Sequence, residues 1–158
     1  MNFLSIHKRL FGKSDWIENP ELKKAIKSFK SNPTPVTRNY LHNVFSKSML
    51  WMATKEQPEG VESSTSPTVL TRETYTEIRI STNASGEPMA VVFTDLKELQ
   101  NRNKSDPKNV SAGGYVQSAE QIINFVLENE FAGIVINPAG NWVELSRAEI
   151  DEIFNLTA

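Results

Sequence analysis

The sequence predicts an α+β domain in which helices pack against a mainly antiparallel or mixed sheet built from hairpins. Three observations predict this class. Helical and strand-like patterns alternate along the chain, the strand-like runs are short, and two pairs of them are joined by turn residues. A chain of 158 residues can form one domain with its own core. We place this domain at residues 19–158, behind an N-terminal arm at residues 1–18.

The arm is basic and amphipathic. In Met1–Lys13, apolar side chains recur at helical spacing with basic residues between them, and Gly12 ends the pattern. We expect a terminal helix that packs on its own domain, or a frayed arm. Docking on a partner or on an anionic membrane is the alternative.

Two helices open the domain. Asn19-Pro20 is a strong helix start, with Asn at the cap and Pro in the first turn. A second helix begins near Pro35, after the chain is broken at residues 32–35, and the two helices form an antiparallel pair. The side chains that we expect to face inward are Leu22, Ala25, Ile26, Phe29, Tyr40, Leu41, Val44 and Phe45.

The first strands follow. Met49–Thr54 is apolar and predicts a buried strand, whereas residues 55–67 have little to bury and predict a flexible loop. Val69–Thr71 predicts a short edge strand. Residues 75–82 alternate between apolar and polar and lead through the turn at residues 83–86 into an apolar strand at residues 88–94, which makes a hairpin.

Capping signals mark two of the next elements. Asp95, with Glu98 three residues later, predicts a capping box and a helix whose inner face carries Leu96 and Leu99. Residues 101–109 are polar, so we expect a loose segment there. Residues 113–116 predict a short strand, and Ser118 with Gln121 predicts a further capped helix with Ala119, Ile122, Ile123, Val126 and Leu127 buried.

The clearest hairpin spans Phe131–Leu145. Its turn residues predict a type I turn with a bulge, in which Gly140 takes the left-handed conformation. That geometry places Asn137 opposite Asn141, Ile136 opposite Trp142 and Val135 opposite Val143. Ser146 with Glu149 then opens a last helix with the apolar stripe Ile150, Ile153 and Phe154.

Composition excludes several classes of function. The chain has no cysteine and only two histidines, so we expect no disulfide, no metal site and no cofactor. A net charge of −2 argues against nucleic acid as a partner. No apolar run is long enough to span a membrane and residues 1–11 lack the pattern of a secretory signal, so we expect a cytoplasmic protein.

Two motifs resemble the SseB family of bacterial proteins. The first is Val92-Phe93-Thr94-Asp95 followed by Leu96 and Leu99, and the second is Gly133-Ile134-Val135-Ile136-Asn137-Pro138 followed by Gly140. The resemblance covers roughly residues 19–154. It implies no agreed reaction and no known catalytic residues, and the family is named for a serine-sensitivity trait.

No catalytic constellation is visible, so we expect that the protein is not an enzyme. His7 and His42 have no partner motif, and helix capping explains the spacing of Asp95 and Glu98. We expect a non-catalytic module that binds another protein; the alternative is a protein that binds or senses a small metabolite, an amino acid such as serine. Self-association is a further hypothesis, because the chain has a basic front and an acidic back. The candidate surface comprises Thr94, Asp95, Asn137, Pro138, Gly140, Asn141 and Trp142.

Overall fold

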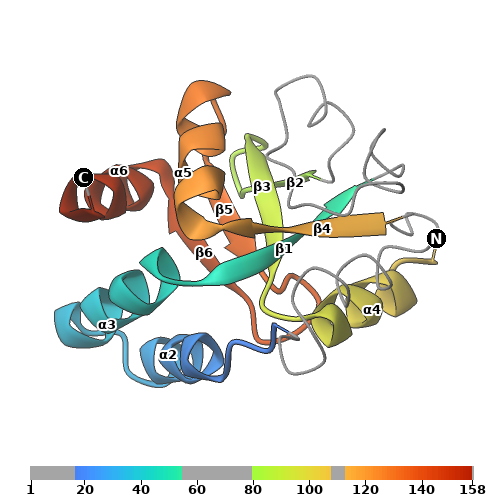
Figure 1. Ribbon diagram of the computed structural model, residues 1–158, viewed down its shortest axis with the longest axis horizontal. Helices are drawn as coiled ribbons and strands as arrows, with labels where there is room; N and C mark the ends of the chain where they lie inside the picture. The colour runs from blue at the N-terminus through green and yellow to red at the C-terminus, as the bar shows by residue number, and fades with distance from the viewer. Residues whose placement is uncertain (1–16, 55–79, 108–112, 158) are drawn as a thin grey trace.

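The computed structural model describes residues 17–54, 80–107 and 113–157. The predicted arm up to residue 16, the loop at 55–67, the edge strand at 69–71 and residues 75–79 lie outside the described residues. Within them the chain forms, in order, α2 (Pro20–Ser31), α3 (Pro35–Ser46), β1 (Met49–Thr54), β2 (Ile80–Thr82), β3 (Pro88–Phe93), α4 (Leu96–Ser105), β4 (Gly113–Ser118), α5 (Ala119–Glu128), β5 (Gly133–Ile136), β6 (Val143–Ser146) and α6 (Arg147–Thr157) (Figure 1).

The described strands form one mixed sheet of six strands, in the order β4-β1-β3-β5-β6, with β2 also paired to β3. Strands β3 and β5 are parallel, and the other pairs are antiparallel. The α+β prediction is confirmed. The two predicted hairpins, β2–β3 and β5–β6, lie side by side and pair through β3 and β5.

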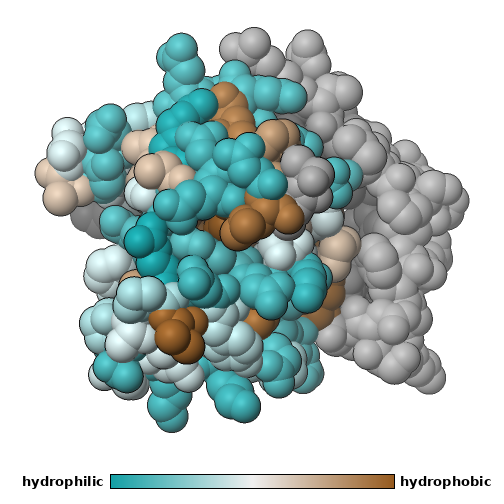
Figure 2. Space-filling model, turned by 90° about the vertical axis from the view of Figure 1, so that its left-hand side faces the viewer, coloured by the Kyte–Doolittle hydropathy of each residue, from teal (hydrophilic) through white to brown (hydrophobic). Residues whose placement is uncertain are grey.

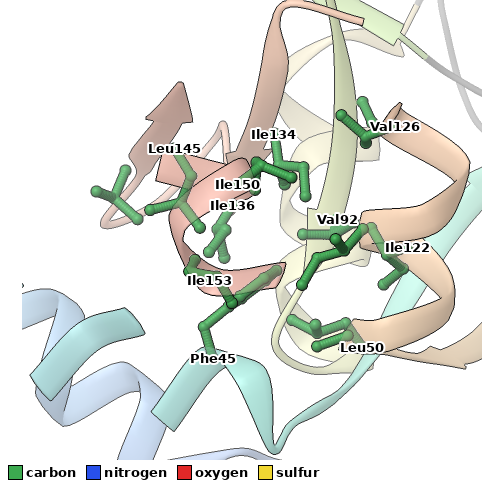
Figure 3. Packing of buried hydrophobic residues seen from close by; sticks show 14 of the residues in the cluster. Phe45, Leu50, Val92, Ile122, Val126, Ile134, Ile136, Leu145, Ile150 and Ile153 are labelled. Atoms are coloured by element: carbon green, nitrogen blue, oxygen red, sulfur yellow. The ribbon is translucent and has the colours of Figure 1, made fainter. Parts of the chain in front are cut away.

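The main core lies between one face of the sheet and helices α2, α3, α5 and α6. Figure 3 shows how Phe45, Val92 and Ile136 meet there from a helix and two strands. The predicted inward positions of α2, α3 and α5 are buried or half-buried. In α6, Ile150 and Ile153 are buried as predicted, but Phe154 is 38% exposed, so the predicted stripe is narrower by one residue.

A smaller core covers the other face of the sheet, where Trp51, Phe93 and Val135 pack against Leu99 of α4. The prediction of a loose segment from residue 101 is wrong for residues 101–105, which continue α4. Leu99 is the one fully buried residue of α4, and Leu96, Glu98 and residues 101–103 are half-buried, so a mostly polar sequence can form this helix.

The predicted register of the last hairpin is wrong by one residue. Ile136 lies opposite Val143 and Val135 lies opposite Glu144, so the loop between the strands is residues 137–142. The left-handed residue is Asn137 (φ 55°), not Gly140. The cause is that Asn137 donates its backbone N–H to Val92 O of β3 and so turns away from β6.

No helix among the described residues is long and apolar enough to cross a membrane.

Candidate functional site

The two motifs that carry the family resemblance meet at the carboxyl ends of β3 and β5. Asn137 Oδ1 accepts from Thr94 N at 3.0 Å, and Asn137 Nδ2 donates to Thr94 Oγ1 at 3.0 Å. Both residues are almost completely buried. Because a buried polar group is costly unless it is hydrogen-bonded, these bonds fasten the two parallel strands at this end of the sheet.

Asn19 ties two further elements to the same point. The predicted helix start is confirmed, but the Asn19 side chain does not cap α2. Its Nδ2 donates to Met49 O of β1 and to Thr94 O, each at 2.7 Å, and Asn19 itself is left-handed (φ 50°). Thr94, Asn137 and Asn19 therefore form a structural junction whose amides and hydroxyl bond to one another and to the backbone.

Asp95 is also held within the fold. It accepts from Glu98 N at 2.9 Å as the N-cap of α4 and forms an ion pair with Lys23 of α2. The capping box is only half formed, because the Glu98 side chain lies against Gly140 instead of returning to the cap. Glu98 Oε2 is buried there and has no hydrogen-bond partner among the described residues. A hollow of about 390 Å³, lined by Lys23, Asp95 and Lys97 among others, opens beside this ion pair.

The exposed part of the predicted site is the end of the β5–β6 loop. A turn closed by Gly140 N and Asn137 O (3.0 Å) leaves Pro138 half-buried and Gly140, Asn141 and Trp142 exposed. Trp142 keeps 47% of its surface exposed, and Lys30 Nζ lies 5.1 Å from the centre of its ring. An ammonium over an indole is a favourable cation–π contact, so α2 holds the indole at the surface. We call Trp142, Lys30 and Asn141 the tryptophan face.

The seven predicted site residues thus separate into two groups. Thr94, Asp95 and Asn137 are buried and bonded within the fold, whereas Gly140, Asn141 and Trp142 are open to solvent and Pro138 lies between them. The structure brings the two motifs together, with the loop exposed to solvent and the residues at the strand ends buried.

A second polar cluster, which sequence reasoning missed, joins α3 to α6. Glu149 Oε1 lies 2.9 Å from Arg38 Nε and 3.3 Å from Nε2 of the buried His42, and Glu149 Oε2 accepts from Ser146 N at 2.8 Å. Burial alone would raise the pKa of the Glu149 carboxyl. The hydrogen bonds from Ser146 and His42 and the charge of Arg38 outweigh burial, so this pKa lies below its ordinary value.

This cluster predicts an acid-sensitive helix contact. A carboxyl whose pKa is lower in the folded chain than in the unfolded chain adds to the free energy of unfolding. This contribution is complete above the unfolded pKa of about 4.3 and is lost as the pH falls through the lower, folded value. We expect Glu149→Gln to lower the free energy of unfolding by about 1–2 kcal/mol at neutral pH. We also expect it to flatten the pH dependence of that free energy below about pH 4.3.

Urea melts over the acidic range measure both effects. Glu152→Gln is the matched control, because this exposed carboxylate lies 3.8 Å from Arg38 and should change little. Identical pH slopes for wild type and Glu149→Gln would contradict the assignment.

The described residues contain no group of three histidine, aspartate or glutamate side chains that could hold a metal ion. Two short polar networks join neighbouring elements. Arg38, His42 and Glu149 connect α3 to α6. Asn19, Thr94 and Asn137 connect the segments at the end of the sheet.

Comparison with known proteins identifies the family. No curated protein and no solved structure matches the chain. Residues 22–152, which include α3 to β6 in full, match the SseB protein N-terminal domain. The chain therefore belongs to the family of the SseB protein N-terminal domain.

Proposed function

We propose that this SseB-type domain is a non-catalytic protein-binding module of the bacterial cytoplasm that contacts its partner through the tryptophan face. The observation that carries the proposal is the half-exposed indole of Trp142, held by Lys30 at the tip of a hairpin. Tryptophan is among the residues that contribute most to protein interfaces, since one rigid side chain buries a large area.

The state of the neighbouring polar groups supports a protein partner over a small ligand. A ligand site needs convergent polar groups that are free to bind, but Thr94 and Asn137 already bond to each other. What remains exposed around the indole is the amide of Asn141 and the ammonium of Lys30, which suits the polar rim of an interface.

Replacing the indole tests the proposal. We expect Trp142→Ala to lose the partner that copurifies with the wild-type protein from its native cell. The substitution should change the free energy of unfolding by less than about 1 kcal/mol, because the side chain is half-exposed. The measurement is quantitative mass spectrometry of tagged protein produced at its native level, with a thermal melt of each variant.

Ile80→Ala is the matched control, because Ile80 of β2 is an apolar side chain of similar exposure, 50%. It should keep the partner. A partner profile that is the same in wild type and Trp142→Ala would refute the tryptophan face as the binding site.

One observation favours a second candidate, a site for an amino acid such as serine. The hollow of about 390 Å³ has Asp95 and Lys23 on its walls, and these opposite charges could pair with the ammonium and carboxylate of a zwitterion. Binding would have to break the existing ion pair, so we rank this function second. A ligand at 100 times its Kd stabilises a protein by about 2.7 kcal/mol, which a thermal-shift titration with serine would detect. A saturable shift that is lost in Lys23→Ala would favour the amino-acid site over the protein module.

A further inference from the structure

Strand β6 is an end strand of the sheet. It follows β5 in the strand order, and no other strand among the described residues pairs with it. Trp142 of the tryptophan face is the residue immediately before this strand. Because unpaired backbone groups on an end strand form a template for a further strand, the tryptophan face continues into a surface that can accept an extended polypeptide. We call the side of β6 away from β5 the open edge.

The hydrogen bonds show which backbone groups lie on the open edge. Bonded and non-bonded residue pairs alternate along an antiparallel ladder. Arg147 N donates to Ala132 O at 2.8 Å, so Glu144, three residues earlier, belongs to a non-bonded pair. Ser146 belongs to the same set, and its N–H accordingly donates to the Glu149 carboxylate and not to β5. The N–H and C=O of Glu144 therefore point to the open edge.

The side chains of β6 alternate in the same way. Val143 and Leu145 are buried in the main core, whereas Glu144 and Ser146 are exposed. The strand is thus anchored to the fold through one set of side chains and through its bonds to β5. A strand added at the open edge would meet the backbone of Glu144 and, beside it, an exposed carboxylate.

That carboxylate is free to pair with a partner. Glu144 has no cation within ion-pair distance among the described residues. Arg147, the nearest cation in the sequence, donates to the backbone carbonyl oxygens of residues 126, 127 and 131. Lys30 lies over the indole of Trp142. Since opposite charges that face each other on neighbouring strands stabilise the pair and like charges destabilise it, the open edge favours a basic side chain opposite Glu144.

The apolar surface on the helical side of the molecule is divided. Figure 2 looks onto the side where α3 and α6 reach the left of Figure 1, and its apolar residues form separate patches in a hydrophilic surface. Strand addition needs no broad apolar patch, because main-chain hydrogen bonds supply affinity and a few side chains supply specificity. An exposed tryptophan beside an open strand edge meets this requirement.

We propose that the partner contributes an extended segment that pairs with the open edge of β6 and places a lysine or arginine opposite Glu144. This mode of binding rests on the proposed function, in which a protein partner contacts the tryptophan face. The segment becomes the next strand of the sheet: the Glu144 N–H donates to one of its carbonyl oxygens, and the Glu144 C=O accepts from one of its N–H groups. Neighbouring side chains of the segment contact the exposed indole of Trp142.

Proline at position 144 tests the backbone pairing. It removes the outward N–H but no bond between β5 and β6, and edge strands tolerate proline where the N–H faces outward. The probe is the protein that copurifies with wild type, identified and then purified, and calorimetry gives its dissociation constant. We expect this constant to be at least tenfold higher in Glu144→Pro than in Glu144→Gln, which keeps the N–H and loses only the charge.

Two further variants complete the series. Glu144→Lys sets like charges opposite each other, so it should bind up to about fivefold more weakly than Glu144→Gln. Thr82→Pro is the comparison for proline on a different edge strand, β2. Asn83 N bonds to Glu87 O, so by the same alternation the Thr82 N–H points away from β3. Thr82→Pro should bind the partner as wild type does, and thermal melts establish that each variant is folded.

Amide hydrogen exchange of the wild-type chain, followed by NMR, needs no substitution. We expect the Glu144 N–H to exchange at least tenfold more slowly in the complex than in the free chain, and the Thr82 N–H to be unaffected. Unchanged exchange at Glu144, or equal affinities for Glu144→Pro and Glu144→Gln, would overturn strand addition. Equal affinities for Glu144→Lys and Glu144→Gln would overturn the basic residue.

These outcomes are distinct from failure of the proposed function. If Trp142→Ala loses the partner but Glu144→Pro keeps it, the tryptophan face stands and strand addition falls. If both variants keep the partner, the tryptophan face falls as well. Protection of the Glu144 amide by self-association of the wild-type chain alone would identify a second copy as the occupant and overturn the assignment to another protein.

Discussion

Asn137→Ala is expected to lower the free energy of unfolding by about 3–5 kcal/mol, a loss large enough to unfold a domain of ordinary stability. Two costs add. The buried N–H of Thr94 loses its acceptor, which costs about 1–3 kcal/mol, and a second bond to the Thr94 hydroxyl is lost as well. In addition, alanine must adopt the left-handed conformation of Asn137, at about 1–2 kcal/mol.

Asn137→Gly separates these two costs. Glycine accepts the left-handed conformation freely but restores neither hydrogen bond, so it should destabilise by about 1–2 kcal/mol less than alanine does. Urea melts of the two variants and the wild type give the difference. Equal stabilities for Ala and Gly would show that the backbone conformation costs nothing here. Wild-type stability in both variants would show that the junction does not fasten the sheet.

The same junction explains which parts of the fold could be predicted from sequence. Helix starts at Pro20, Ser118 and Ser146, and strands at residues 49–54 and 133–136, follow from local capping and apolar patterns, and the structure confirms them. A cap or a turn depends on residues within about four positions, so its chemistry is visible in a short stretch.

The errors come from contacts that are distant in sequence. Local turn chemistry pairs Asn137 with its hairpin neighbour, but its backbone N–H bonds to Val92 O and its side chain to Thr94, 43 positions away. These bonds turn Asn137 away from β6 and shift the hairpin register by one residue. Its sequence position predicts that Asn19 caps its own helix, but its side chain donates to Met49 O and Thr94 O instead. A short polar side chain can serve either purpose, and only the assembled fold decides between them.

The candidate site also combines features that the local sequence predicts with features that depend on distant contacts. The sequence predicts Trp142 within the hairpin strand opposite Ile136, whereas the structure places it in the loop before β6, where it is 47% exposed. The cluster of Arg38, His42 and Glu149 spans 107 positions between His42 and Glu149, and each residue alone has an ordinary explanation on its own helix. No local signal in the chain links them.

Gly133→Ala is the second large effect that we expect, a loss of more than about 4 kcal/mol or failure to fold. Gly133 opens β5 opposite Ser146 with φ 156°, and a Cβ at this position would overlap the backbone carbonyl oxygen of Leu145 on the paired strand β6. The same Cβ would lie 3.1 Å from Cε of Met89. A flexible methionine can move aside, but the oxygen belongs to the strand ladder, so relief requires β5 and β6 to separate.

Gly140→Ala provides the matched control. A Cβ there would overlap the carboxylate of Glu98, which is the end of a flexible side chain. Its Oε2 has no hydrogen-bond partner within the described part of the chain. That carboxylate can swing towards water, where its unpaired oxygen becomes hydrated, so we expect a change of less than about 1 kcal/mol. Urea melts of the two alanine variants measure the contrast, and Met89→Ala should not rescue Gly133→Ala, because the obstacle is backbone. A Gly133→Ala protein as stable as Gly140→Ala would mean that β5 and β6 do not pair in this register, and the position of the tryptophan face would then have to be abandoned with it.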